Sequence, residues 1–297
     1  MSTVMLRRGV AALGMSMAAA ACQATEGNGL GLYPDGLENF LSGALPPSGV
    51  HTLVYAGGGQ YDKLRDNDGK HIGPPDFKVK FGAVVPRVVW VTPHTLLGGQ
   101  LAFEALAPLL SVDVRAGGQT FSKVGVGDLV LGAVLGYHHS PALHSAFGFD
   151  IYAPTGQYDR NNPASLGRNV WALQPVAAVS YAQPVGLNVD VKAMWDIPRR
   201  NDDTQTRSGQ ALHADYAMGW GLGNGWVVGV GGHVYRQITD DKGPNAGTGK
   251  ASSLAIGPSL RYANDKGLMI TVKFQQEFHV RNRPEGQQLW VKASLPF

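Results

Sequence analysis

Apolar and polar residues alternate along most of the chain after Gly49. In residues 187–196 the odd positions are apolar and nearly all of the even positions are polar. Residues 270–280 repeat this pattern, with Lys273, Glu277 and His279 on the polar face. Because successive side chains of a strand point to opposite faces, the period of two predicts strands with one apolar and one polar face.

Short turns and longer polar connections alternate between these predicted strands. The short turns are predicted at residues 92–94, 140–143, 183–186, 223–225 and 264–267. The longer connections are predicted at residues 60–75, 116–124, 156–167, 198–208, 240–250 and 282–286. Outer-membrane barrels have tight periplasmic turns and longer external loops. The pattern therefore predicts an all-β fold, a transmembrane antiparallel β-barrel of about twelve strands over residues 49–297. A secreted β-sandwich is the alternative, but it has no reason to separate short from long connections.

Aromatic residues gather beside both kinds of predicted connection. Those beside the short turns are Trp90, Tyr137, Tyr181, Trp220, Trp226 and Tyr262, and those near the long loops are Tyr61, Phe121, Trp171, Trp195 and Trp290. Aromatic girdles mark the two interfaces of a membrane barrel, so we expect these side chains to face lipid. The terminal Phe297 follows an alternating apolar segment and resembles the signal that delivers barrels to the barrel-assembly machinery.

The N-terminus is typical of a secretory signal. Two arginines at residues 7–8 precede an apolar stretch over residues 9–21 that is too short to span a bilayer. Small residues follow, which predicts a signal peptide over residues 1–24 that is cleaved on export. The alternative is a lipoprotein box in which Cys22, the only cysteine of the chain, is acylated.

Residues 25–48 differ from the strands that follow. Asp35 to Glu38 could form a capping box, and Pro46 and Pro47 would end a short helix. We expect this N-terminal segment to be either a plug inside the lumen or a periplasmic leader, and the plug is the favoured interpretation.

Composition supports the membrane barrel and excludes other classes. The chain has 40 glycines and 16% charged residues, where a soluble domain has about 25%. A formal net charge of +3, with no dense basic cluster, argues against a nucleic-acid partner. The expected location is therefore the cell outer membrane, with outer-membrane lipid around the barrel.

Polar residues of the alternating segments are the candidates for lining the lumen. They are Lys78, Lys80, Glu104, Asp128, Asp150, Asp190, Lys192, His213, Asp215, Arg261, Lys273, Glu277 and Lys292. A wide ion-selective pore would more often carry one sign in excess. Because the two signs are nearly balanced, the pattern favours cross-strand ion pairs in a narrow lumen, with a subset that could select a substrate.

The histidines do not form a convincing catalytic or metal site. His138 and His139 precede one short turn and, as neighbours, point to opposite faces. His213 and Asp215 share a face, as acid–base partners would, but no nucleophile is identifiable. We predict no metal, no cofactor and no enzyme activity, and an outer-membrane hydrolase remains an alternative.

Several segments together resemble one family. They are residues 38–41 and 44–47, 97–100, 138–141, 150–156, 158–159, 167–169, 213–216, 219–226, 239–241, 257–258, 275–278, 282–284 and 295–297. The chain is similar to proteins of the meta-pathway of phenol degradation, which are regarded as outer-membrane transporters. The resemblance implies a channel for small hydrophobic or aromatic compounds, and offers no catalytic residues to match. A structural barrel with a sealed lumen is a further alternative.

Overall fold

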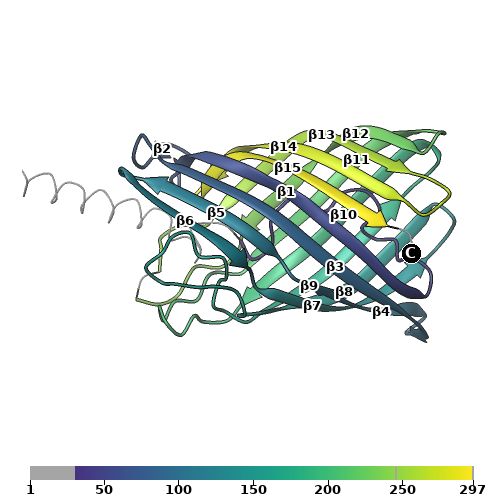
Figure 1. Ribbon diagram of the computed structural model, residues 1–297, viewed down its shortest axis with the longest axis horizontal. Helices are drawn as coiled ribbons and strands as arrows, with labels where there is room; N and C mark the ends of the chain where they lie inside the picture. Colours follow the sequence, from purple (N-terminus) through teal and green to yellow (C-terminus); the bar gives the residue numbers. More distant parts are fainter. Residues whose placement is uncertain (1–30, 245, 296–297) are drawn as a thin grey trace, which may run out of the picture.

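The computed structural model describes residues 31–244 and 246–295, and these form a single antiparallel β-barrel (Figure 1). The predicted signal peptide, Cys22 and Phe297 lie outside the described residues. The strands are β1 Gly49–Arg65, β2 His71–Ile72, β3 Lys78–Leu96, β4 Gly99–Leu106, β5 Leu109–Ala116, β6 Gln119–Val126, β7 Leu129–His138, β8 Leu143–Ala153, β9 Ala172–Tyr181, β10 Val185–Pro198, β11 Ala211–Leu222, β12 Trp226–Gln237, β13 Ser252–Ala263, β14 Met269–Arg281 and β15 Pro284–Leu295.

The barrel is closed, as the sequence predicts. β1 pairs with β15 on one side and with β3 on the other, so the first and last strands meet. β4 and β5 are two parts of one wall strand, because both pair with β3, and β6 and β7 likewise form one interrupted strand. The wall thus has 12 strands, with β2 as a short addition to β1. No described segment is a helix long and apolar enough to cross a membrane.

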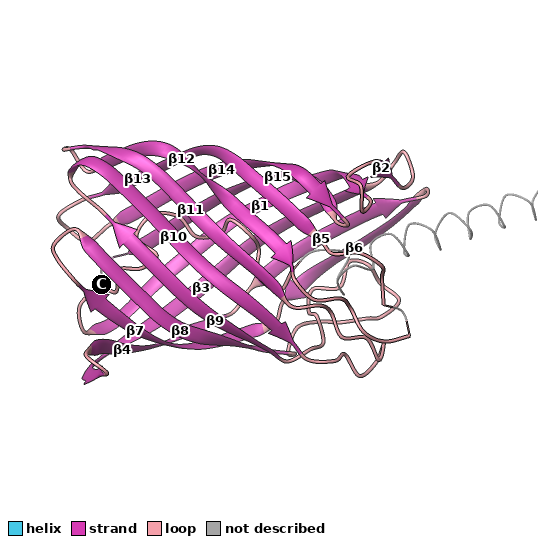
Figure 2. Ribbon diagram, turned by 180° about the vertical axis from the view of Figure 1, so that it is seen from behind, coloured by secondary structure: helices cyan, strands magenta, loops and turns pink. Residues whose placement is uncertain are grey.

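The long connections gather at the end of the barrel opposite the C-terminal end (Figures 1 and 2). Three of the predicted connections are wrong. Residues 92–94 belong to β3, and the chain turns instead at Leu97 and Gly98, which both have positive φ. The segments 116–124 and 282–286 contain only two-residue turns, at residues 117–118 and 282–283, because the flanking residues extend the strands.

The two faces of the wall differ in polarity, as the alternation predicts. Along β10, Asn188, Asp190 and Lys192 are buried inside the barrel, and Leu187 and Val191 are exposed on its outside. The exposed outer residues include Phe147, Phe149, Leu212, Met218, Trp220, Val228, Val230 and Phe274. Lipid is the solvent that such an apolar outer surface requires.

The alternation changes phase near the end of β14. His279 has a φ of 51° and lies on the exposed side, whereas Val280 is buried. A register shift between β13 and β14 accompanies this change. The prediction that His279 shares the inner face with Glu277 is therefore wrong, because a bulge inserts one residue and reverses the facing.

Lys78 and Lys80 do not line the lumen, and this prediction is wrong. Lys80 is exposed on the outside of the barrel, opposite Asp113 of β5, while Val79 and Phe81 occupy the inner face. β3 has 19 residues, whereas about 9–11 residues of a tilted strand cross a bilayer. Its first residues therefore extend beyond the apolar band, where lysines on the outer face meet water.

The predicted aromatic girdles are correct only in part. Trp90, Trp220 and Trp226 are exposed on the outer surface. Tyr61 and Trp290, in contrast, are buried inside the barrel at 3% and 2% exposure. Trp290 follows from the alternation itself, because its neighbours Leu289 and Val291 face outward.

Residues 31–48 lie inside the barrel, and the short helix predicted here is absent from these residues. Gly36 and Leu41 have positive φ, at 85° and 66°, so the segment is a series of turns. Its backbone N–H groups donate mainly to side chains of the wall rather than along a helix, as the next section describes. We call residues 31–48 the lumenal segment.

Candidate functional site

Asp215 of β11 holds the start of the lumenal segment. Its carboxylate accepts hydrogen bonds from the Tyr33 hydroxyl at 2.7 Å, from the Gly36 N–H at 2.6 Å and from the Glu38 N–H at 2.8 Å. Burial, followed by the charges of Asp215 and Glu38, raises the pKa of Tyr33 well above its usual value. The Tyr33 hydroxyl therefore stays protonated and remains a donor.

Asp35 of the lumenal segment pairs with basic groups of the wall. Its carboxylate lies 3.0 Å from the Arg283 guanidinium and 3.1 Å from His213 Nδ1. Burial alone would raise the pKa of Asp35, but Arg283 and His213 hold it well below its usual value. Asp35 is therefore an anion that the basic groups Arg283 and His213 stabilise inside the barrel.

Glu38 makes a second set of ion pairs deeper in the lumen. Its carboxylate lies 2.9 Å from both Arg87 and Lys292 and accepts a hydrogen bond from the Tyr55 hydroxyl at 2.8 Å. Burial opposes ionisation, yet the cations Lys292, Lys192 and Arg87 keep the pKa of Glu38 well below its usual value. The Lys273 ammonium also donates to the Glu38 carbonyl oxygen.

The rest of the lumenal segment is tied to β9, β10 and β13. The Ser42 N–H donates to Asp190 at 3.0 Å, and the Gly43 N–H donates to the Ser180 hydroxyl at 2.8 Å. Asn39 Oδ1 accepts from the Ser259 hydroxyl at 2.7 Å. The segment is thus fastened to the wall at several heights of the barrel.

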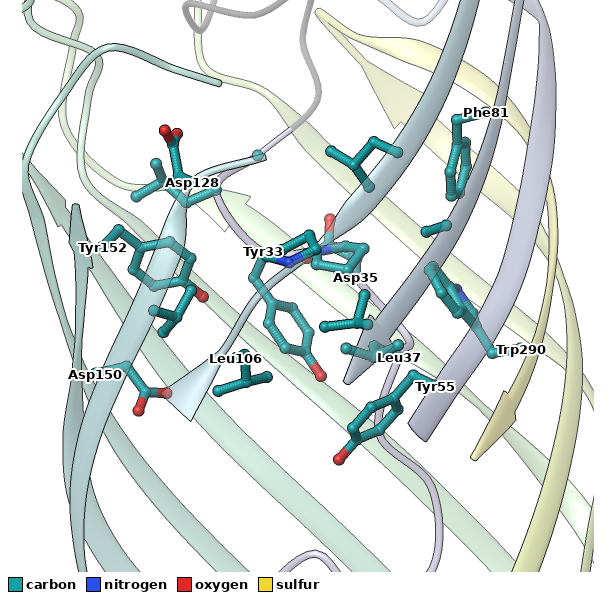
Figure 3. Close-up of a pocket in the computed structure, with 18 of the residues that line it drawn as sticks. Tyr33, Asp35, Leu37, Tyr55, Phe81, Leu106, Asp128, Asp150, Tyr152 and Trp290 are labelled. Atoms are coloured by element: carbon teal, nitrogen blue, oxygen red, sulfur yellow. The ribbon is translucent and has the colours of Figure 1, made fainter. Parts of the chain in front are cut away.

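A cavity of about 160 Å³ lies between the lumenal segment and the wall on the side of β1, β3, β4, β5, β7, β8 and β15 (Figure 3). Leu106, Leu110, Val112 and Val130 line it from the wall, and Leu37 lines it from the segment. This apolar side is unlike the polar interior beside β10 to β14.

An aromatic row forms one side of the cavity. Tyr61 stacks on Phe81 with ring centroids 6.0 Å apart, and Phe81 meets Trp290 at 5.8 Å. Gly57 and Gly59 of β1 give these rings room: a Cβ would lie 2.5 Å from Trp290 Cε3 and 2.7 Å from Phe81 Cε1, respectively. The absence of side chains at these two positions of β1 therefore leaves space for the rings of Phe81, from β3, and Trp290, from β15.

Charged side chains border the opposite, inner corner of the cavity. The carboxylate of Glu104 on β4 accepts a hydrogen bond from Arg87 Nε at 2.7 Å. Asp150 of β8 lies beside Glu104, and Lys192 of β10 also lines the cavity. At the outer end, Asp128 accepts from the backbone N–H groups of Gly156 at 2.9 Å and Arg168 at 2.7 Å.

The predicted lumen residues fall into four groups. Lys78 and Lys80 are outside, as described above. Glu104, Asp128, Asp150 and Lys192 border the cavity. Asp190, His213, Asp215, Lys273 and Lys292 contact the lumenal segment. Glu277 lies 3.7 Å from Arg283, and Arg261 is buried on the inner face of β13 away from the cavity.

Several functional residues were missed by sequence reasoning. Arg87 was missed because it stands in the almost wholly apolar run 79–91, where both faces of β3 are apolar. Such a run in a barrel with a polar interior is itself the signal for an apolar cavity wall. Arg283 was missed because it lies in the turn between β14 and β15, where the alternation of a strand does not predict whether a side chain points into the barrel or outward.

Among the described residues, the two buried histidines, His213 and His233, do not form the arrangement that the predicted alternative of a hydrolase would need. His213 lies between Asp35 and Asp196, whereas Asp215 is occupied by the lumenal segment. The same nitrogen of His233, Nε2, faces both the Ser253 hydroxyl at 3.1 Å and Glu277 at 3.4 Å, and His233 is fully buried. A triad needs the acid on the other ring nitrogen.

Metal ligands do not gather either. Over the described parts of the chain, no three His, Cys, Asp or Glu side chains are placed to hold a metal ion. His138 and His144 approach one another at 2.7 Å between their Nδ1 atoms, beside an exposed turn.

Comparison with known proteins agrees with this architecture. An outer membrane channel from Pseudomonas putida F1 has a TM-score of 0.78 at 20% sequence identity, covering 88% of this chain and 99% of that chain. The beta domain of the Bordetella autotransporter BrkA has a TM-score of 0.50 at 11% identity, covering 84% and 99%. The transport unit of the autotransporter AIDA-I from Escherichia coli has a TM-score of 0.50 at 9% identity, covering 94% and 99%. These likenesses show the fold of an outer-membrane barrel.

Sequence comparison identifies the family. No curated protein sequence matches the chain. A family model described as "Putative MetA-pathway of phenol degradation" matches residues 61–293. The match covers most of the chain and agrees with the resemblance of the separate segments. The chain is therefore an outer-membrane β-barrel that belongs to the MetA-pathway family of phenol degradation.

Proposed function

We propose that the protein is a passive outer-membrane channel for single-ring aromatic or similarly small hydrophobic molecules. The observation that carries the proposal is the cavity of about 160 Å³ with its aromatic and aliphatic lining. An apolar cavity of about 150 Å³ in another protein stays dry and binds benzene. A ring of that size therefore fits beside Phe81 and Trp290, on the aromatic side of the cavity, while charged side chains such as Glu104 and Lys192 border its inner corner.

The lumenal segment acts in this proposal as a plug. It fills the barrel interior on the polar side and leaves the apolar cavity on the other side, so the two parts divide the lumen between them. Leu166 and Arg168 of the connection between β8 and β9 border the outer end of the cavity. The first residues of the lumenal segment lie at the same end, since Arg168 donates to the Gly31 carbonyl oxygen, so a molecule arriving from the long-loop end would pass between this segment and the wall.

The proposal assigns no enzyme activity to the chain. The histidines of the interior are engaged in the network that anchors the plug, and the aromatic cavity holds no histidine among its lining residues. Members of the same fold named above include a channel, which agrees with a transport role.

Binding of fluorobenzene, followed by fluorine NMR on the refolded protein in detergent, tests the cavity directly. Ala83 lines the cavity, whereas its neighbour Val84 faces outward. We expect Ala83→Trp to fill the cavity and abolish binding, and Val84→Trp to leave binding unchanged. Equal binding by both variants would place the probe on the outer surface and refute the proposal.

A structural barrel with a sealed lumen is the second candidate, and the many hydrogen bonds of the lumenal segment favour it. Uptake of toluene into vesicles that carry the protein separates the two. Faster uptake than into empty vesicles, slowed again by Ala83→Trp, supports the channel. Uptake equal to that of empty vesicles favours the sealed barrel.

A further inference from the structure

The outer surface of the barrel changes from apolar to charged along β3, β5 and β6, near the long-loop end (Figure 1). Val84, Leu109 and Val126 stand in register across these three strands, and all of them are exposed on the outside. On the same face of β3, Lys80 precedes Val84 by four residues, and Lys78 lies one step further towards the long loops. The apolar band therefore ends just below two outward-facing lysines.

These lysines lie at the level of the lipid headgroups. Trp90 is exposed on the outside of β3, towards the short-turn end, and marks the interface on that side of the bilayer. Lys80 precedes Trp90 by ten residues, and about 9–11 residues of a tilted strand cross a bilayer. Lys80 and Lys78 therefore stand at the opposite interface, where their alkyl stems cover apolar surface and their ammonium groups reach the hydrated headgroup layer.

The carboxylates near the two lysines are engaged by other donors. Asp113, which stands in register with Lys80, accepts a hydrogen bond from the Ser122 hydroxyl. Asp76 accepts from the two backbone N–H groups of the turn between β5 and β6, at 2.9 Å and 2.7 Å. Neither Lys78 nor Lys80 forms a hydrogen bond or an ion pair with another residue of the described ranges. Two ammonium groups at the interface are thus left without a counter-ion from these parts of the chain.

A hollow of about 660 Å³ lies beside these lysines, on the outside of β1, β2, β3 and β5. Four cationic side chains and two carboxylates border it, and they are Lys63, Arg65, Lys78, Arg115, Asp62 and Asp76. Lys78 and Arg115 stand directly opposite each other in register, and like charges in such a pair repel. An anion placed between them would relieve this repulsion. Next to Lys80 the wall is also open, because a Cβ at Gly82 would meet no atom within 4 Å.

We propose that Lys78, Lys80 and Arg115 form a binding site for a phosphorylated glycolipid of the outer leaflet. Its acyl chains lie against the apolar row below the lysines, its phosphate accepts charge-assisted hydrogen bonds from the three cations, and its sugars extend into the hollow. A glycerophospholipid also carries a phosphate, but its headgroup is too small to fill a hollow of this volume. Because the site lies on the outside of the barrel, the inference does not depend on the proposed function.

Titration of the refolded protein in detergent with deep-rough lipopolysaccharide, followed by native mass spectrometry, tests the inference. From the usual contribution of one basic side chain near an anionic lipid surface, we expect Lys80→Ser to weaken binding roughly fivefold. The double variant Lys78→Ser, Lys80→Ser should weaken it roughly thirtyfold. Asp62→Asn removes a carboxylate that borders the hollow and should strengthen binding instead. Heat-modifiable mobility in electrophoresis shows that each variant has folded.

Lys266→Ser is the matched control, because Lys266 is an exposed lysine in the short turn between β13 and β14, at the other end of the barrel. It removes the same charge and should leave binding unchanged. Equal binding by the wild-type protein and the folded double variant would overturn the inference, as would equal weakening by Lys266→Ser, which would assign the effect to net charge. Phosphatidylglycerol that binds as tightly as lipopolysaccharide, or displacement of the lipopolysaccharide by inorganic phosphate, would overturn the assignment to a glycolipid.

Discussion

Asp215 offers the sharpest test of whether the lumenal segment is held by specific hydrogen bonds. Its carboxylate accepts three of them, from the Tyr33 hydroxyl and from the backbone N–H groups of Gly36 and Glu38, at 2.6–2.8 Å. All of these donors are buried. Asp215→Ala removes the acceptor and leaves three buried donors without a partner, while the barrel strands keep their own backbone pairing.

The structure sets the size of the effect. Each hydrogen bond to a charged group contributes about 1.5–3 kcal/mol, and the three bonds form one unit, so their contributions do not simply add. Taking about 4 kcal/mol as the cost to the docked segment, its open population should rise roughly a thousandfold. Asp215→Asn retains a carbonyl oxygen of similar shape and should show a smaller rise.

Hydrogen exchange of residues 33–43, measured by mass spectrometry on the refolded protein, reports this opening. We expect much faster exchange in Asp215→Ala for these amides only, together with a noisier ion current across planar bilayers. Glu285→Ala is a suitable control, since Glu285 pairs with Arg65 at 2.7 Å and forms no hydrogen bond or ion pair with residues 31–48. Unchanged exchange in residues 33–43 would show that Asp215 does not hold the segment and would refute the reasoning.

Two further predictions concern pH and the outer surface. Because the folded pKa of Asp35 is depressed, its contribution is complete above the ordinary carboxyl pKa of about 4 and is lost only at much lower pH, so the carbon NMR signal of the Asp35 carboxyl group should not shift between about pH 7 and 5. Arg283→Met removes the main opposing charge, burial then raises the pKa of Asp35, and this signal should titrate at higher pH than in the wild-type protein. Val230→Arg, at mid-height of the apolar outer face, should cost about 2–4 kcal/mol in urea unfolding from lipid vesicles. Leu222→Arg, at the strand end beside a turn, should cost about 0–1 kcal/mol, and equal costs would contradict the assignment of the lipid-facing band.

The barrel could be predicted because a strand between lipid and a polar interior needs alternating apolar and polar residues. This alternation shows which side chains point outward and which point into the barrel, and β10 and β11 follow it along almost their full length. The rule fails where its physical basis fails. Outside the apolar band, at Lys80, water lies on the outer face, and at His279 a bulge reverses the phase.

The cavity could not be predicted in the same way, because it depends on contacts between distant parts of the chain. The rings of Phe81 and Trp290 meet across β1, and only the pairing of β1 with both of their strands brings them together. The lumenal segment adds Tyr33 and Leu37, whose positions follow from the side chains that bind them. A capping pattern at residues 35–38 predicts a helix locally, but ion pairs with the wall outweigh that preference.

The chemistry of the anchoring network bears on what the lumenal segment does. Permanent attachment would be achieved at least as well by apolar packing, because a buried ion pair recovers little more than the cost of removing its charges from water. Asp35 and Glu38 are nevertheless buried against Arg283, Arg87 and Lys292. Each of these charges is well solvated once water enters the lumen, but release of the segment would also expose Leu37 and Phe40, which are buried against the wall. Reversible release of the segment, which a channel closed by its own chain requires and a purely structural barrel does not, is what hydrogen exchange in Asp215→Ala tests.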